Sequence, residues 1–271
     1  MATFLIIDTK HTKNIKSLLK RYFLKPIKMK KIIYLPVAFA FMLYSCKKSP
    51  VTKPVKFTAT SYETLGTYTS TGMPDYLTTP DTIPPDMLSF IDTLLPNGVD
   101  LRPRHPELLN NTAIADITIT QPSDVYITFV KEDGGFTNSI AFYTYPTNLP
   151  PASATDIHLI TYVFPNAGHI TPLTPGDKVK IGNFQPGTSI GFVLMQNAWN
   201  STSHDLNNDA VHFCTNDALN PEVDPNLKKH AVLVNYAPTK KIIVGFEDTD
   251  RTTSQCDNDF NDVLFYCTVT P

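Results

Sequence analysis

Short runs in which apolar and polar residues alternate, separated by turn residues, fill most of the chain from about residue 114 onward. In one of them, Val125, Ile127 and Phe129 alternate with their neighbours, and Asp133-Gly134-Gly135 follows as a hairpin loop. A period of two is typical of β-strands, because successive side chains point to opposite faces. The pattern predicts strands at 114–119, 125–130, 140–145, 157–164, 178–182, 188–196, 230–236, 240–246 and 262–269.

Patterns that favour helices are scarce. The 271 residues include 11 Gly and 23 Pro, and proline disrupts helix interiors because it lacks a backbone donor. One short helix is expected between a cap at Asp81 or Thr82 and a stop at Pro96-Asn97-Gly98. Its apolar face would consist of Met87, Leu88, Ile91, Leu94 and Leu95. We therefore expect an all-β domain over 114–271, an antiparallel β-sandwich or jelly-roll-like fold, with this N-terminal helix in a helical or irregular lead-in over 81–113.

The first 46 residues differ in charge from the rest of the chain. They contain nine Lys or Arg and one acid, a net charge of +8, whereas residues 47–271 contain 14 basic and 24 acidic side chains, a net charge of −10. Segments with such different charges usually have different roles. The acidic body excludes nucleic acid as a partner, because nucleic-acid binding needs a basic surface.

An apolar run over 32–45 follows the basic start Met29-Lys30-Lys31. Its 14 residues are fewer than the roughly 20 that span a bilayer and suit a signal peptide. It ends in Leu43-Tyr44-Ser45-Cys46, which resembles the lipobox of bacterial lipoproteins. The resemblance implies a lipoprotein signal peptide over 29–45 and lipidation of Cys46, which would anchor the protein to a membrane. A plain secretory signal followed by a chance cysteine is the alternative.

The segments on either side of this signal complete the predicted organisation. Met29 is expected to be the true start, so that 1–28 would be a mis-called upstream extension. Residues 46–80 are rich in Thr, Ser and Pro and are expected to form a flexible tether. Together these features predict an outer-membrane lipoprotein of the cell envelope, with its periplasmic or surface position left open.

Six carboxylates crowd into residues 247–262, between the last two expected strands. The flanking strands would hold these charges close together, and their repulsion calls for a counter-ion. The alternation Asp257-x-Asp259-x-Asn261 offers oxygen atoms of the kind that Ca²⁺ prefers, whereas the stretch has no His and only one Cys. The spacing is not that of an EF-hand. If Asp257 is counted as position 1, Asp262 stands at position 6, where an EF-hand has Gly, and Thr268 stands at position 12, where it has Glu. The stretch predicts a Ca²⁺ site, with a solvated acidic loop as the alternative.

The motifs of this region resemble a known family. Gly245-Phe246-Glu247-Asp248, followed by Asp257-Asn258-Asp259-Phe260-Asn261-Asp262 and an apolar strand, is similar to the C-terminal signature of LruC-type domains of unknown function, found in bacterial lipoproteins and secreted proteins. Earlier segments match in order, so the resemblance covers about 115–271. It implies a β-rich domain without an assigned activity, in which an insertion around Cys256 leaves the role of Asp250 open. The metal ligands that it implies are Glu247, Asp248, Asp257, Asp259, Asn261 and Asp262.

Three cysteines follow Cys46, and an oxidising envelope predicts one disulfide among them. Cys214 and Cys256 lie in polar, turn-rich segments, which favours their pairing. A Cys256–Cys267 bond is the alternative. Cys267 itself lies on the apolar face of an expected strand and is predicted to be a buried thiol.

No convincing catalytic constellation is present. The motif Gly187-Thr188-Ser189-Ile190-Gly191 matches a nucleophile elbow, but an expected strand follows it where such an elbow needs a helix. Our main hypothesis is therefore a non-enzymatic, calcium-stabilised binding or adhesion module for a glycan or a protein. The alternatives are an envelope polysaccharide hydrolase that uses Glu132 or Glu247, and a structural surface-layer component. Four aromatic residues could form a sugar platform, although buried packing is their commoner role: Tyr143, Tyr145, Phe192 and Trp199.

Overall fold

The central strands bury side chains on both faces in the structure, a computed structural model that describes residues 55–110, 113 and 115–271. On β14 (Val263–Thr270), Phe265 and Cys267 lie in one apolar cluster, whereas Leu264 and Tyr266 lie in another. Successive residues of a strand face opposite ways, so a strand that is apolar at every position must be covered on both sides. The fold provides this cover by stacking two sheets and packing further segments outside them.

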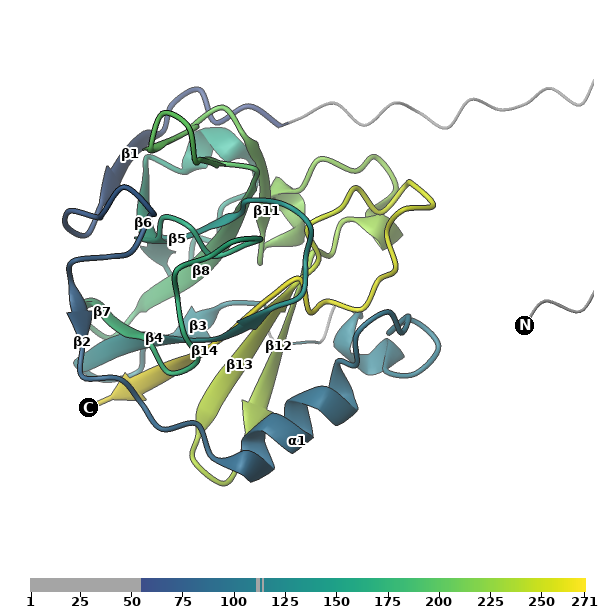
Figure 1. Cartoon of the computed structure of the whole chain (residues 1–271). Coiled ribbons are helices and arrows are strands. Elements are labelled where there is room, and N and C mark those ends of the chain that lie inside the picture. Colours follow the sequence, from purple (N-terminus) through teal and green to yellow (C-terminus); the bar gives the residue numbers. More distant parts are fainter. Residues whose placement is uncertain (1–54, 111–112, 114) are drawn as a thin grey trace, which may run out of the picture. The chain divides into compact units, whose positions relative to one another are not determined.

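Figure 1 shows the two sheets facing each other. The first contains, in spatial order, β1 (Ser61–Thr64), β6 (Leu159–Phe164), β5 (Ser139–Pro146), β8 (Thr188–Gln196) and β11 (Val211–Cys214), with β3 (Ile117–Thr118) also paired to β8. The second contains β12 (Ala231–Tyr236), β13 (Lys241–Phe246), β14, β4 (Ser123–Glu132), β7 (Lys178–Phe184) and β2 (Leu77–Thr78). A separate small hairpin joins β9 (Trp199–Asn200) to β10 (Asp205–Leu206). All these pairings are antiparallel except that of β1 with β6.

Aromatic residues fill the space between the sheets. Phe192 on β8 meets Phe265 on β14 edge to face, with ring centroids 5.1 Å apart. Both side chains are fully buried, together with Phe129 of β4 and Val244 of β13. These contacts confirm the expected sandwich-like all-β fold. The strand 188–196 has the expected bounds, whereas most other predicted strand ends shift by one to three residues. β11 and the short strands β1, β2, β9 and β10 were not predicted.

The expected helix forms as α1 (Pro85–Leu94) and covers the outer face of the second sheet (Figure 1). Met87, Ile91 and Leu95 are fully buried in a cluster that includes Leu264 and Tyr266. Leu88, which was expected on the same apolar face, is 36% exposed. In the part of the chain that the structure describes, no helix is long and apolar enough to cross a membrane.

The segment expected to be a flexible tether over 46–80 differs from that prediction in its described part. β1 pairs in parallel with β6, β2 pairs with β7, and Phe57 is buried beside the first sheet. These strands are four and two residues long, too short to show a period of two in a Thr-rich sequence, and they depend on partners a hundred residues away. The upstream extension 1–28, the signal peptide 29–45 and Cys46 lie outside the described residues.

Candidate metal centre

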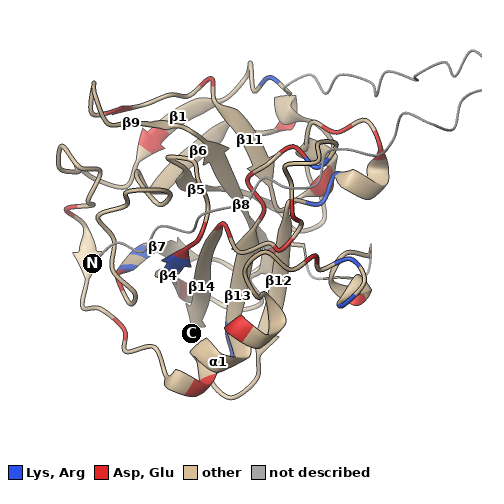
Figure 2. Cartoon of the chain, turned by 45° about the vertical axis from the view of Figure 1, so that its right-hand side comes forward, with Lys and Arg blue, Asp and Glu red and all other residues tan. Residues whose placement is uncertain are grey.

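The acidic residues come together because β13 and β14 are paired where one ends and the other begins. Phe246 lies opposite Val263, so the residues that follow and precede them, Glu247 and Asp262, leave the sheet side by side. The backbone N–H of Asp248 donates to Asp262 Oδ2 at 2.7 Å and closes the base of the loop. Figure 2 shows acidic segments of the loops gathered beyond the ends of these strands.

The far half of the loop folds back through two residues in the left-handed region of backbone space. Asn258 has φ 60° and Phe260 has φ 58°, and the acidic residues 257 and 259 flank the first of them. Phe260 is fully buried in the cluster beneath α1. Non-glycine residues seldom adopt this conformation, so the surrounding contacts must hold the loop in place.

Segments distant in the sequence supply those contacts. The backbone N–H of Gly98, just after α1, donates to Asp259 Oδ2 at 2.7 Å, and the side-chain amide of Asn261 donates to Leu95 O at 3.3 Å. On the other side, Asn138 Nδ2 donates to Asp248 Oδ2 at 2.6 Å. No sequence pattern predicted that Gly98 and Asn138 contact the acidic loop, because these contacts depend on the tertiary fold.

The carboxylates form two groups that share Glu247. The inner group consists of Glu247, Asp248 and Asp262, and the outer group of Glu247, Asp257 and Asp259. Within each group one oxygen from each residue lies within 4.8 Å of the others, so either group could hold a metal ion. Of the six predicted ligands, the structure thus brings five carboxylates into these groups. Asn261 adjoins them through its backbone N–H, which donates to Asp259 Oδ1 at 3.1 Å.

In the described part of the chain, no cationic side chain forms an ion pair with the two groups. Among the described residues, none of these five carboxylates lies within 4.0 Å of a Lys, Arg or His nitrogen. Arg251 is buried in the same loop, but it donates to Lys229 O at 2.7 Å and to Asn258 Oδ1 at 2.9 Å, and its guanidinium lies over the Phe260 ring. The negative charge is therefore crowded and largely buried, and no cationic side chain of the described residues forms an ion pair with it.

This crowding shows in the acid–base chemistry of the loop. Burial, with added repulsion from neighbouring carboxylates, raises the pKa of Glu247 to about 7 and that of Asp262 to about 10. Burial likewise raises the pKa of Asp259 to about 6, against hydrogen bonds from Gly98 and Asn261 that lower it. Shifts in this direction mean that the ionised carboxylates are poorly solvated, which a bound divalent cation would correct.

One oxygen of the cluster lacks any partner. Glu247 is 1% exposed, and its Oε2 is buried without a hydrogen bond.

Two glycines allow other backbone segments to lie close to the acidic loop. A Cβ on Gly134, in the β4–β5 hairpin, would lie 2.7 Å from Asp248 Oδ2, and one on Gly245 would lie 2.3 Å from Phe260 O.

The structure corrects the predicted disulfide. Cys214, Cys256 and Cys267, the cysteines of the described residues, are free and buried. Cys214 lies in the cluster outside the first sheet and Cys267 in the cluster between the sheets, whereas Cys256 is next to the acidic groups, so neither the Cys214–Cys256 nor the Cys256–Cys267 bond forms. The polar sequence around Cys214 concealed its place in an apolar cluster. Cys267 is the buried thiol that its strand position predicted.

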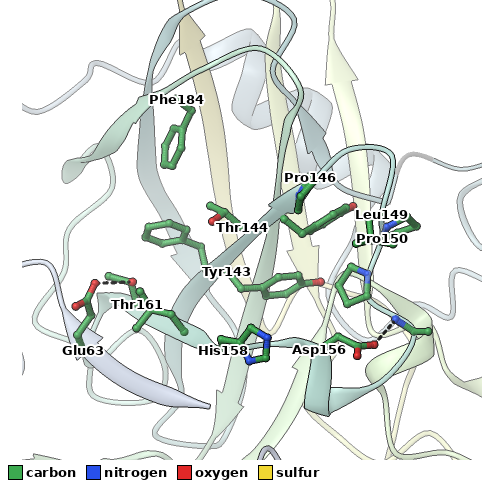
Figure 3. A pocket seen from close by; sticks show the side chains of 15 residues that line it. Glu63, Tyr143, Thr144, Pro146, Leu149, Pro150, Asp156, His158, Thr161 and Phe184 are labelled. Atoms are coloured by element: carbon green, nitrogen blue, oxygen red, sulfur yellow. Dashed lines mark hydrogen bonds between the residues drawn. The ribbon is translucent and has the colours of Figure 1, made fainter. Parts of the chain in front are cut away.

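A separate pocket of about 690 Å³ lies at the end of β5 and β6 (Figure 3). Tyr143 and Tyr145 stack in its wall with ring centroids 6.1 Å apart, and His158 lies nearby. Its two carboxylates already have partners, since Glu63 accepts from Thr161 Oγ1 at 3.1 Å and Asp156 accepts from two backbone N–H groups at the start of a 3-10 turn.

Other suggestive residues have structural surroundings. Phe192, Trp199 and Tyr143 are buried and Tyr145 alone of the four is half-buried, so these aromatic residues do not form one sugar platform. Ser189 lies on β8, which runs on to Gln196, and its Oγ is 2.9 Å from Thr147 Oγ1. No helix follows it as a nucleophile elbow requires.

Comparison with known proteins concerns the C-terminal part of the chain. No curated protein and no solved structure matches the chain. Residues 184–270 match the family model described as "Domain of unknown function (DUF4114)". The match covers about a third of the chain, from the end of β7 through β14. The whole acidic loop, with both carboxylate groups, thus lies within a region similar to a domain of unknown function.

Proposed function

We propose that the protein is a lipid-anchored component of the cell envelope whose β-sandwich is stabilised by Ca²⁺ and acts as a binding or adhesion module. One observation carries the proposal: five carboxylates, mostly buried, meet at the junction of β13 and β14 without a cationic side chain in contact among the described residues. Such an arrangement costs free energy unless an ion compensates it.

The donor set favours Ca²⁺ over other ions. Both groups consist only of carboxylate oxygens, which suit hard cations. Cys256 lies next to them, but burial raises the pKa of its thiol, so a thiolate ligand for zinc is disfavoured. Mg²⁺ demands an octahedral shell and keeps much of its water, whereas Ca²⁺ tolerates irregular sets of oxygens.

The family assignment belongs to the same proposal. The Gly-Phe-Glu-Asp motif at 245–248 and the run 257–262 support an LruC-type domain over 114–271, since they supply all the carboxylates of the two groups. The anchor at Cys46 rests on the lipobox-like motif alone.

The pocket beside β5 offers a place for the ligand of this module. It combines the half-buried ring of Tyr145, which stacks on the buried Tyr143, with the polar side chains of Thr144 and His158. Aromatic faces bordered by hydrogen-bonding groups suit a sugar ring, whose two sides are apolar and whose rim carries hydroxyls. We therefore propose a glycan as the preferred ligand, with a protein segment as the other candidate.

A binding screen tests the proposal. The chain would be applied to an array of cell-wall and extracellular glycans, and used in pull-downs from envelope fractions, with Ca²⁺ or with a chelator. We expect binding that weakens in chelator and in Tyr145→Ala, but not in Tyr126→Ala, a tyrosine of β4 outside the pocket. Turnover of a glycan would instead support a hydrolase, and self-association without any ligand would support a surface-layer component.

A further inference from the structure

We propose that the acidic loop binds two adjacent Ca²⁺ ions, one in the inner and one in the outer group, with Glu247 as the carboxylate that bridges them. This inference rests on the proposed calcium-stabilised function and specifies its stoichiometry and geometry. It starts from the division of the five carboxylates into two groups that have only Glu247 in common.

The size of a calcium coordination shell favours two positions. Oxygen ligands lie about 2.3–2.6 Å from Ca²⁺, so two ligands of one ion are at most about 5 Å apart. Each group fits this limit, because its ligand atoms lie within 4.8 Å of one another. The pair Asp248 and Asp262 and the pair Asp257 and Asp259 do not fall into a common group within this limit, which favours a separate position for each pair.

Glu247 has the properties of a bridging ligand. It is 1% exposed, yet its Oε2 is buried without a hydrogen-bond partner. A carboxylate has about four lone-pair positions on its two oxygens and can serve two cations at once. A buried, unpartnered oxygen on the one residue that both groups share is an observation independent of the number of acidic residues, and it indicates a missing ligand at this point.

The total charge of the five carboxylates also favours two Ca²⁺ ions. When all five carboxylates are ionised, one Ca²⁺ leaves a net charge of −3 in the cluster and two leave −1. Arg251 does not make up the difference by direct contact, since its N–H groups donate to Lys229 O and Asn258 Oδ1. A second divalent cation therefore balances the cluster better than one.

Different parts of the fold hold the two groups. The inner group is fixed by Asn138, which donates to Asp248, and by the close approach of Gly134. The outer group is fixed by Gly98, which donates to Asp259, and it reaches the surface at the exposed Asp257. Substitutions can therefore remove one position while leaving the supports of the other in place.

Calcium titration of the full chain, monitored by calorimetry and by native mass spectrometry, tests the proposal with the metal alone as the probe. We expect two bound ions in the wild type, one in Asp257→Asn and one in Asp248→Asn. Asp250→Asn is the matched control and should retain two, because Asp250 belongs to neither group and its Oδ1 accepts from Thr252.

The number of Ca²⁺ ions bound by the wild type tests the two-ion centre and calcium stabilisation separately. A single ion in the wild type would overturn the two-ion centre but leave calcium stabilisation intact, and no bound ion would overturn both. Two ions retained in Asp257→Asn would also contradict it. Because Asp257 is exposed, this variant remains informative even if Asp248→Asn fails to fold, and circular dichroism of each variant verifies its fold.

Discussion

Glu247 is the residue of the acidic loop that is both buried and shared by the two carboxylate groups. It directly follows β13, belongs to both carboxylate groups and has one oxygen without a partner. An ionised carboxylate in such a place is stabilising only when a cation accompanies it. Its contribution to stability should therefore change sign with the supply of Ca²⁺.

Replacing this carboxylate by an amide tests that statement. In chelator at pH 8, above the pKa of about 7 of Glu247, Glu247→Gln should melt at a higher temperature than the wild type, because a buried charge has been removed. In excess Ca²⁺ the order should reverse, since the variant loses most of a stabilisation of roughly 2.7 kcal/mol at a hundredfold excess over Kd. Glu107→Gln, an exposed glutamate, is the control and should match the wild type in both buffers. The same order of melting temperatures in both buffers would contradict the prediction.

At the scale of elements, the β4–β5 hairpin and the β13–β14 loop depend on each other. Gly134 and Gly135 are neighbours in this hairpin, but only a side chain at Gly134 would collide with the acidic loop, at 2.7 Å from Asp248 Oδ2. A Cβ on Gly135 would meet nothing within 4 Å. The hairpin glycines were expected from the sequence as a turn, whereas this contact with the metal centre was not.

These two glycines form a matched pair of variants. Gly134→Ala should lower the free energy of unfolding by roughly 1–3 kcal/mol, as overpacking does, and weaken Ca²⁺ binding because the inner group must shift. Gly135→Ala should change neither property by more than about 0.5 kcal/mol. Chemical denaturation and calcium titration of both variants provide the measurement. Equal effects from the two substitutions would show that the hairpin does not support the centre.

A contact between Tyr62 on β1 and His212 on β11 helps to hold β1 in place. Tyr62 Oη lies 2.9 Å from His212 Nε2, and His212 Nδ1 lies 2.7 Å from Ala210 O, which can only accept. Burial lowers the pKa of His212 to about 4. The folded state therefore requires the neutral ring, whereas the unfolded chain becomes protonated near the usual value of about 6.5.

This difference predicts acid sensitivity. The contribution of neutral His212 to the free energy of unfolding is complete above about pH 6.5. It is lost as pH falls towards 4, because the unfolded state binds more protons than the folded state in this range. The loss is of the order of 3 kcal/mol, from about 1.4 kcal/mol for each pH unit. His212→Gln should flatten this part of the stability curve in urea unfolding experiments between pH 4 and 7, whereas His204→Gln, an exposed histidine, should not. An unchanged slope in His212→Gln would place the sensitivity elsewhere.

The elements also show which features can be predicted from sequence. Period-two patterns identified β4, β5, β8, β12, β13 and β14, because each has enough apolar residues to reveal its faces. The pattern could not reveal β1 and β2, or the parallel pairing of β1, because short Thr-rich strands are defined by their partners. The acidic loop was recognisable from the density of its carboxylates. Its division into two groups was not, because Gly98, Gly134 and Asn138 approach it only in the tertiary fold.

For the molecule as a whole, the acidic cluster should set how stability depends on pH when no cation is bound. In the folded state, burial and mutual repulsion raise the pKa of the Glu247 and Asp262 carboxyls well above the value near 4 at which unfolded carboxyls lose their protons. The folded state thus binds more protons, and the free energy of unfolding should fall as pH rises from about 5 to 8. Melting curves in chelator should show this fall, and saturating Ca²⁺ should remove it. A fall of the same size with and without Ca²⁺ would contradict the assignment of the cluster.

Calcium-dependent thermal stability provides the most direct test of the metal centre. The melting temperature of the full chain would be recorded at pH 7.5 in chelator, after addition of Ca²⁺, and after addition of Mg²⁺ at the same concentration. We expect Ca²⁺ to raise it by several degrees, consistent with roughly 2.7 kcal/mol at a hundredfold excess over Kd, and Mg²⁺ to raise it much less. Identical melting curves in chelator and in Ca²⁺ would contradict a calcium site in the acidic loop.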